Sequence, residues 1–109
     1  MHNAHVRISP SEAYEMMRVG DVLILDVRSQ DEFNDGHIYG AVLLPEDEIR
    51  ERAFDVIISK SQTVLLYCRS GRRSDNAARA LSEMGFLYVF DFGGILDWPY
   101  EVITTDGGG

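Results

Sequence analysis

Two short, uninterrupted apolar runs constrain the fold of this chain more than any other feature of its sequence. They cover residues 22–25 (VLIL) and 64–67 (VLLY), and each is followed by a polar turn and a helix-start signal. Strands that are apolar on both sides of the pleat occur where helices cover both faces of a parallel sheet. The alternation therefore predicts an α/β fold with a mainly parallel sheet and right-handed crossover connections.

Two capping boxes mark helix starts. Ser9 with Glu12, and Ser29 with Glu32, place a serine before the helix and a glutamate three positions later. Glycines and apolar positions at helical or strand spacing define the other elements. The predicted helices cover about 10–19, 30–35, 46–57 (with Ile49, Ala53, Phe54 and Ile57 facing the core), 74–84 and one turn at 95–98. The predicted strands cover 5–8, 22–25, 42–44, 63–67 and 86–90, and a turn is predicted at 93–94.

Length and composition indicate one ordinary globular domain. The 109 residues are enough for one hydrophobic core and too few for two. We expect this domain to cover residues 1–103, with a flexible C-terminal tail over 104–109, where little can be buried. No apolar run approaches the length that a bilayer requires, and the start of the sequence lacks an export segment. A cytoplasmic location is therefore expected.

Charge and cysteine content exclude several classes of site. A net charge of −8 argues against nucleic acid or an anionic membrane as a partner, because both are bound through clustered lysine and arginine. A single cysteine excludes an internal disulfide and a cysteine-based zinc cluster. The three histidines show no metal-ligand spacing. We therefore expect no metal site.

The one cysteine, Cys68, follows the second apolar run, at the end of a strand where open α/β sheets bind ligands. The amino end of the following helix and three nearby arginines favour a thiolate over a thiol. Gly71 allows the turn to bend so that successive amides point at the sulfur. The sequence predicts Cys68 as a nucleophile, beside a turn that binds a small anion and consists of Arg69, Ser70, Gly71, Arg72 and Arg73.

Each of these residues also has a purely structural interpretation. Cys68 would then be a small buried apolar side chain, and the arginines would only be solvated. No histidine is close to Cys68 in sequence, which points away from a cysteine–histidine pair. The remaining candidates are interpreted as scaffold: Asp26, Arg28 and Glu32 as an ion-pair network, His37 as a structural histidine, and Asp97 and Trp98 as a lid on the core. The glycines at 93–94 form either a tight turn or a close backbone approach to the site.

Three segments carry a family resemblance. They are residues 25–45 (LDVRSQDEFNDGHIYGAVLLP), 67–74 (YCRSGRRS) and 92–98 (FGGILDW). With these segments in this order, the chain resembles a single-domain rhodanese, a sulfurtransferase, over about residues 8–98. The resemblance implies a three-layer α/β/α fold with a five-stranded sheet in the order 1-5-4-2-3. It also implies an active-site loop over residues 68–73.

The resemblance further implies a double displacement. Cys68 would take a sulfane sulfur from a small anionic donor such as thiosulfate, hold it as a persulfide, and pass it to cyanide, a thiol or a protein sulfur acceptor. Amides of residues 69–73 would cradle the outer sulfur, Arg69 and Arg73 would attract the donor, and no cofactor would be needed.

Three alternatives share this fold. One is a non-catalytic or sulfur-carrier interaction module. The others are phosphatases and arsenate reductases; in the phosphatases the loop is one residue longer and an arginine stands six positions after the cysteine. That position is Ser74 here, which disfavours phosphatase activity. Arg73 occupies a position where sulfurtransferases often have a small hydroxyl residue, which leaves the donor preference open.

Overall fold

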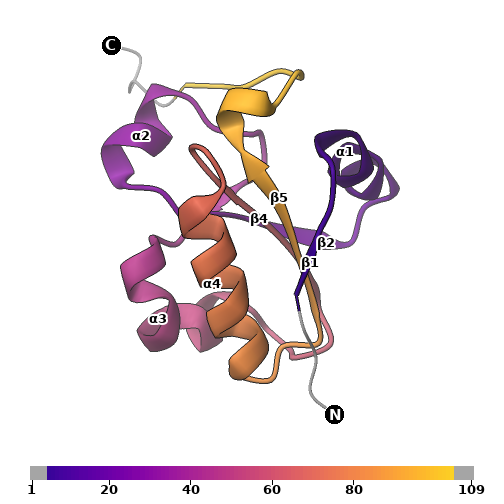
Figure 1. Cartoon of the computed structure of the whole chain (residues 1–109), viewed down its shortest axis with the longest axis vertical. Coiled ribbons are helices and arrows are strands. Elements are labelled where there is room, and N and C mark those ends of the chain that lie inside the picture. The colour runs from indigo at the N-terminus through magenta and orange to yellow at the C-terminus, as the bar shows by residue number, and fades with distance from the viewer. Residues whose placement is uncertain (1–4, 105–109) are drawn as a thin grey trace.

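Five parallel strands form the centre of the computed structural model, which describes residues 5–104 (Figure 1). Every neighbouring pair in the sheet is parallel, and the strand order is β1-β5-β4-β2-β3. This confirms the predicted α/β class and the predicted strand order. The strands are β1 (Val6–Arg7), β2 (Val22–Asp26), β3 (Val42–Leu43), β4 (Thr63–Cys68) and β5 (Tyr88–Gly94).

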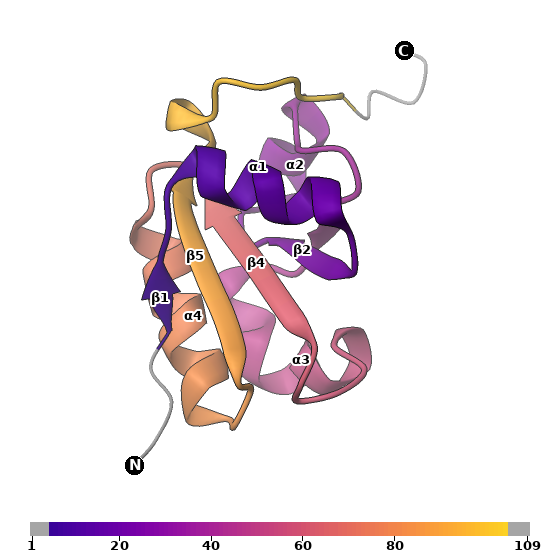
Figure 2. The ribbon, with the colours of Figure 1, turned by 90° about the vertical axis from the view of Figure 1, so that its right-hand side faces the viewer.

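Helices cover both faces of this sheet, as the uninterrupted apolar runs predict. Figure 2 shows α1 in front of the sheet and α3 and α4 behind it. The helices are α1 (Pro10–Val19), α2 (Gln30–Asp35), α3 (Ile49–Val56) and α4 (Arg72–Glu83), with 3-10 turns η1 (Glu46–Glu48) and η2 (Ile95–Asp97). Both predicted capping boxes are formed, at Ser9 and at Ser29. Within residues 5–104, no helix has the length and apolar character needed to cross a membrane.

The alternation of side chains along β4 places the candidate nucleophile. Leu65 and Tyr67 face the α1 side, in a cluster that includes Trp98. Leu66 and Cys68 face the opposite side and pack in the core formed with α3 and α4. Because neighbouring residues of a strand point to opposite faces, both faces of β4 are buried. Cys68 therefore lies on the side of the sheet that α4 covers.

The last strand and the last long helix differ from the prediction. Helix α4 begins at Arg72, two residues earlier than predicted. Residues 93–94 are not a turn, because β5 continues through them and Gly94 pairs with Cys68 of β4. The strand also begins at Tyr88 and not at residue 86, where the buried Phe86 packs against the core as part of the connection from α4.

Two core assignments were wrong in part. Phe54 is 59% exposed, because the buried positions around α3 are Ile49, Ala53 and Ile57. Its ring instead packs at the surface against Phe86, with centroids 5.3 Å apart. Of the predicted lid, Trp98 is buried whereas Asp97 is exposed. The predicted flexible tail lies outside the described residues, apart from Thr104.

Candidate active site

Cys68 is the last residue of β4, and the chain turns immediately after it into α4. Figure 1 shows this turn at the same end of the sheet as α2 and η2. Gly71 has φ +107°, a conformation that favours glycine, and its N–H donates to Cys68 Sγ over 3.0 Å. The cysteine is 1% exposed. The sulfur thus lies beside the amino end of a 12-residue helix, where backbone dipoles favour negative charge.

The end of β5 packs against the turn that follows Cys68. A side-chain Cβ at Gly94 would lie 2.1 Å from the carbonyl oxygen of Arg69, so that position has no room for a side chain. The same carbonyl accepts a hydrogen bond of 3.2 Å from the backbone N–H of Leu96. Of the two interpretations of residues 93–94, the structure shows the close backbone approach. The path of the turn depends on this contact.

Arg73 connects the turn to α2. Its guanidinium donates to both carboxylate oxygens of Glu32, over 2.8 and 2.9 Å. These hydrogen bonds lower the pKa of Glu32 to about 2, and the same contact raises the pKa of Arg73. Glu32 therefore pairs with the turn, and it interacts with Arg28 only through its charge, without the direct ion pair that the sequence led us to expect. Arg73 has a partner within the protein before any anion is bound.

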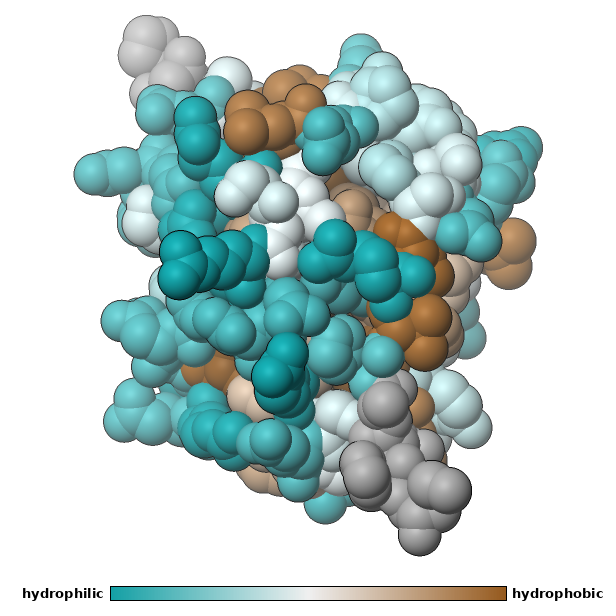
Figure 3. All heavy atoms as spheres, in the orientation of Figure 1, coloured by the Kyte–Doolittle hydropathy of each residue, from teal (hydrophilic) through white to brown (hydrophobic). Residues whose placement is uncertain are grey.

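The other two arginines of the turn are available to ligands. Arg69 and Arg72 are exposed, as is Ser70, and neither guanidinium forms an ion pair within residues 5–104. Figure 3 shows this face of the molecule as largely hydrophilic, with apolar side chains in separate groups, one of them over η2. The turn thus presents unpaired positive charge on a protein whose net charge is −8. A small anion would be attracted there.

A buried polar network beside Cys68 was not predicted. The thiol lies 3.6 Å from Ser74 Oγ, which lies 2.7 Å from Asp91 Oδ1. Asp91 also accepts hydrogen bonds from the backbone N–H of Gly93 over 2.9 Å and from Arg7 over 2.8 Å. The sequence contains one signal for it, because Asp91 is a charged residue within the apolar run of residues 88–92. A buried carboxylate in a central strand requires partners.

Asp26, Arg28 and Tyr67 form a separate network that fits the scaffold interpretation. Arg28 donates to Asp26 through Nε and Nη2, and the Tyr67 hydroxyl donates to the same carboxylate over 2.7 Å. Burial opposes the charged form of Arg28, but its hydrogen bonds with Asp26 outweigh this effect and raise its pKa. Burial, together with the Asp26 charge, raises the pKa of Tyr67. These groups hold the ends of β2 and β4 together.

His37 also fits its structural interpretation. It is 5% exposed, and its Nδ1 lies 2.8 Å from the carbonyl oxygen of Phe33. Its ring stacks on the Phe33 ring with centroids 3.7 Å apart. The side chain thus closes the end of α2.

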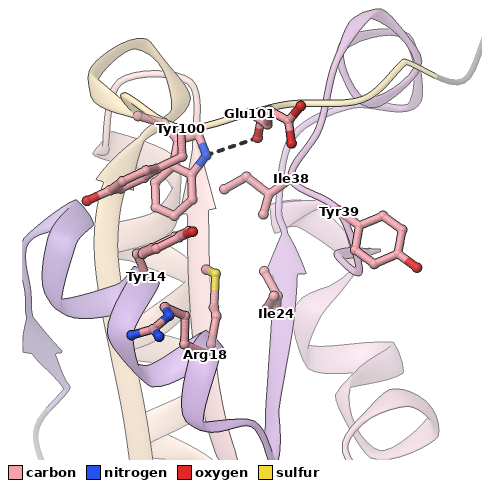
Figure 4. Close-up of a pocket in the computed structure, with 9 residues that line it drawn as sticks. Tyr14, Arg18, Ile24, Ile38, Tyr39, Tyr100 and Glu101 are labelled. Carbon is pink, nitrogen blue, oxygen red and sulfur yellow. Dashed lines mark hydrogen bonds between the residues drawn. The ribbon is translucent and has the colours of Figure 1, made fainter.

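Two further features lie apart from the turn. An apolar cavity of about 420 Å³ lies between α1 and the C-terminal segment; Figure 4 shows Tyr14 and Tyr100 side by side at its edge, and Cys68 does not line it. His5, Asp75 and Asp91 have potential metal-ligand atoms within 4.8 Å of one another. However, Arg7 pairs with Asp91 and His5 pairs with Asp75, so protein groups already satisfy both carboxylates.

Comparisons with known proteins agree with this arrangement. A family model described as "Rhodanese-like domain" matches residues 9–100. The thiosulfate sulfurtransferase PspE of Escherichia coli is 38% identical over 73 residues, which cover 67% of this chain and 70% of that protein. The thiosulfate sulfurtransferase GlpE of Coxiella burnetii is 35% identical over 101 residues and 92% of each chain. A solved E. coli rhodanese with anions has a TM-score of 0.71 at 34% identity, covering 75% of this chain and 96% of that one.

The match over residues 9–100 includes β2, β4 and β5 and the turn after Cys68. It rests on both sequence and fold, since the E. coli rhodanese is similar to this chain in sequence and superposes on it with a TM-score of 0.71. The chain therefore belongs to the rhodanese-like domain family.

Proposed function

We propose that this protein is a sulfurtransferase that carries sulfane sulfur as a persulfide on Cys68. The observation that carries this proposal is the 3.0 Å hydrogen bond from the Gly71 N–H to Cys68 Sγ at the amino end of α4. A thiolate, and the persulfide anion that replaces it, are both stabilised by backbone N–H groups and by the helix dipole. The thiosulfate sulfurtransferases to which the chain is similar support the same class of reaction.

The reaction proceeds in two displacements. The Cys68 thiolate attacks the sulfane sulfur of thiosulfate, a new S–S bond forms, and sulfite leaves with the electron pair of the S–S bond that breaks. Cyanide or a thiolate acceptor then attacks the outer sulfur, and the Cys68 thiolate leaves. Each step exchanges one S–S bond for another bond to sulfur, so charge balances without an added oxidant or reductant.

The residues of the turn take different roles in this proposal. Backbone amides of residues 69–73 cradle the outer sulfur of the persulfide. Arg69 and Arg72 attract the anionic donor, since both are exposed and unpaired within the described residues. Arg73 fixes the position of the turn through Glu32. The partners are a small anionic sulfur donor and a cyanide, thiol or protein acceptor.

Phosphate-ester hydrolysis fits this turn less well. The position six residues after Cys68 is Ser74, which is fully buried and bonded to Asp91. A buried serine cannot supply the bidentate guanidinium contact that a tetrahedral phosphate receives from arginine. This turn therefore suits sulfur transfer better than phosphate-ester hydrolysis.

Thiocyanate formation from thiosulfate and cyanide tests this function. The wild-type protein should form thiocyanate catalytically, and both Cys68→Ser and Cys68→Ala should reduce the rate to background while the thermal unfolding midpoint changes little. Full activity in Cys68→Ser, or no turnover by wild type across thiosulfate, persulfides and thiosulfonates, would overturn the proposal.

A further inference from the structure

A chain of three side chains runs from the Cys68 sulfur to the edge of the sheet. Ser74 comes from α4, Asp91 from β5 and Arg7 from β1. The successive distances are 3.6 Å from Sγ to Ser74 Oγ, 2.7 Å from Ser74 Oγ to Asp91 Oδ1, and 2.8 Å from Asp91 Oδ2 to Arg7 Nη2. Cys68 is 1% exposed, and both Ser74 and Asp91 are fully buried. Solvent therefore screens the interactions of Cys68, Ser74 and Asp91 only weakly, whereas the Arg7 side chain at the end of the chain is half exposed.

The Ser74 hydroxyl has one proton and several acceptors. The carbonyl oxygens of Gly71 and Gly93 each lie 3.2 Å from Oγ, whereas Asp91 Oδ1 lies at 2.7 Å and is charged. A charge-assisted bond at the shorter distance is the strongest of the three, so the proton points at Asp91. The oxygen lone pairs of Ser74 then face the sulfur. This arrangement suits a thiol, which donates S–H to Ser74, and it repels a thiolate.

The charged groups around this chain come from several helices and strands and from the loops beside them. Arg7 contacts Asp91 directly and also donates to the Gly71 carbonyl over 3.2 Å. His5 and Asp75 lie near Asp91, and they pair with each other at 3.0 Å. On the sulfur side, Arg73 pairs with Glu32, and Arg69 and Arg72 are exposed in the turn that follows Cys68. Since His5 pairs with Asp75 and no other cation contacts the Asp91 carboxylate within residues 5–104, Arg7 is the charge that directly offsets Asp91.

We propose that Asp91 is a positioning residue that sets the protonation state of Cys68, because it accepts the hydrogen bond of the Ser74 hydroxyl. We further propose that the positive charge of Arg7 weakens this hydrogen bond. This inference deepens the proposed function, because it concerns the same cysteine. When Cys68 ionises, the S–H bond breaks, the electron pair stays on sulfur and the proton goes to water. Ser74 can then rotate its O–H from Asp91 to the thiolate, while Asp91 keeps the Gly93 N–H and Arg7 as donors. Asp91 and the thiolate thus compete for one proton.

The competition predicts opposite effects for two substitutions. Asp91→Asn removes the competing negative charge, so Cys68 should become reactive toward alkylation at a lower pH than in wild type. Arg7→Met leaves Asp91 without its positively charged partner, so Asp91 should accept the Ser74 hydrogen bond more strongly. Cys68 should then become reactive toward alkylation only at a higher pH. Arg7 is an edge residue whose side chain is 53% exposed, so Arg7→Met should fold even if Asp91→Asn does not.

Iodoacetamide alkylation measured against pH tests the proposal, because the thiolate is the reactive form and Cys68 is the only cysteine. The expected order of alkylation midpoints is Asp91→Asn, then wild type, then Arg7→Met. In a Ser74→Ala background, which lacks the linking hydroxyl, the shift caused by Asp91→Asn should shrink. The proposal would be overturned if the three proteins had equal alkylation midpoints, or if both substitutions shifted the midpoint in the same direction. It would also be overturned if Asp91→Asn caused the same shift in the Ser74→Ala background as in wild type. The assay uses no sulfur donor, so its failure is distinct from a failure of sulfur transfer.

Discussion

At the scale of single residues, Gly94 shows how one position determines the geometry of the candidate site. Its φ is −123°, a value that any residue adopts, so backbone freedom does not explain the glycine. The reason is space, because a Cβ there would lie 2.1 Å from the Arg69 carbonyl oxygen. Displacing that carbonyl would move the turn that delivers the Gly71 N–H to the sulfur.

Gly94→Ala should therefore destabilise the protein and disturb the turn. We expect the free energy of unfolding in urea to fall by about 2–3 kcal/mol, the upper part of the range of about 1–3 kcal/mol that is usual for forcing an atom into a packed site. Gly40→Ala is the control, since its Cβ would meet nothing within 4 Å and its φ of +87°, in the turn closed by the hydrogen bond from the Ala41 N–H to the Ile38 carbonyl, should cost only about 1 kcal/mol. Similar losses in the two variants would show that the Arg69 contact does not restrict this site.

At the scale of elements, the Glu32–Arg73 ion pair joins α2 to the amino end of α4. It depresses the pKa of Glu32 from 4.5 to about 2. A depressed carboxyl pKa contributes stability that is present above pH 4.5 and is lost as the pH falls toward 2. The contact should therefore weaken in acid and be fully formed at neutral pH.

Glu32→Gln should lower the free energy of unfolding at pH 7 by about 1–2 kcal/mol, a value reduced for the partial exposure of both side chains. The difference from wild type should narrow steadily between pH 4.5 and pH 2, as urea unfolding at several pH values would show. Glutamine can still complete the capping box at Ser29, so the helix start is retained. A more exposed pair provides the comparison: Glu83→Gln, opposite Arg50, should cost less than about 0.5 kcal/mol, because both side chains are more than half exposed. A pH-independent loss in Glu32→Gln would contradict the assigned ion pair.

Local patterns account for the elements that the sequence predicted well. The runs at β2 and β4 are apolar because both faces are covered, and both capping boxes depend on residues three positions apart. The contact between Arg73 and Glu32 spans 41 residues, so no local pattern could show it. Phe54 was misplaced because an apolar residue beside a buried stripe satisfies helical spacing and still faces solvent.

At the scale of the whole molecule, charge is distributed unevenly. The net charge is −8, yet the turn after Cys68 presents Arg69 and Arg72 without ion-pair partners in the described part of the chain. The net negative charge of the molecule would therefore oppose the approach of a dianion, whereas the two arginines of the turn would attract it. Such long-range steering depends on ionic strength, because exposed charges are screened within about 8–10 Å in ordinary buffers.

The double variant Arg69→Gln/Arg72→Gln should raise the KM for thiosulfate roughly tenfold at low salt, since it removes both unpaired cations. Added potassium chloride should raise the wild-type KM toward that of the variant and should leave the variant nearly unchanged. The double variant Arg50→Gln/Arg79→Gln is a matched charge control, because it also removes two exposed arginines, each paired with a carboxylate, and it should behave as wild type. If the wild-type KM for thiosulfate did not change with salt concentration, these arginines would not be attracting the donor.

The mass of the intact protein after exposure to thiosulfate tests the central claim most directly. With no acceptor present, the wild-type protein should gain the mass of one sulfur atom on Cys68, and added cyanide should remove it with formation of thiocyanate. Cys68→Ser should gain nothing under the same conditions. An unchanged wild-type mass across several sulfane donors, or an equal gain in Cys68→Ser, would contradict a persulfide on Cys68.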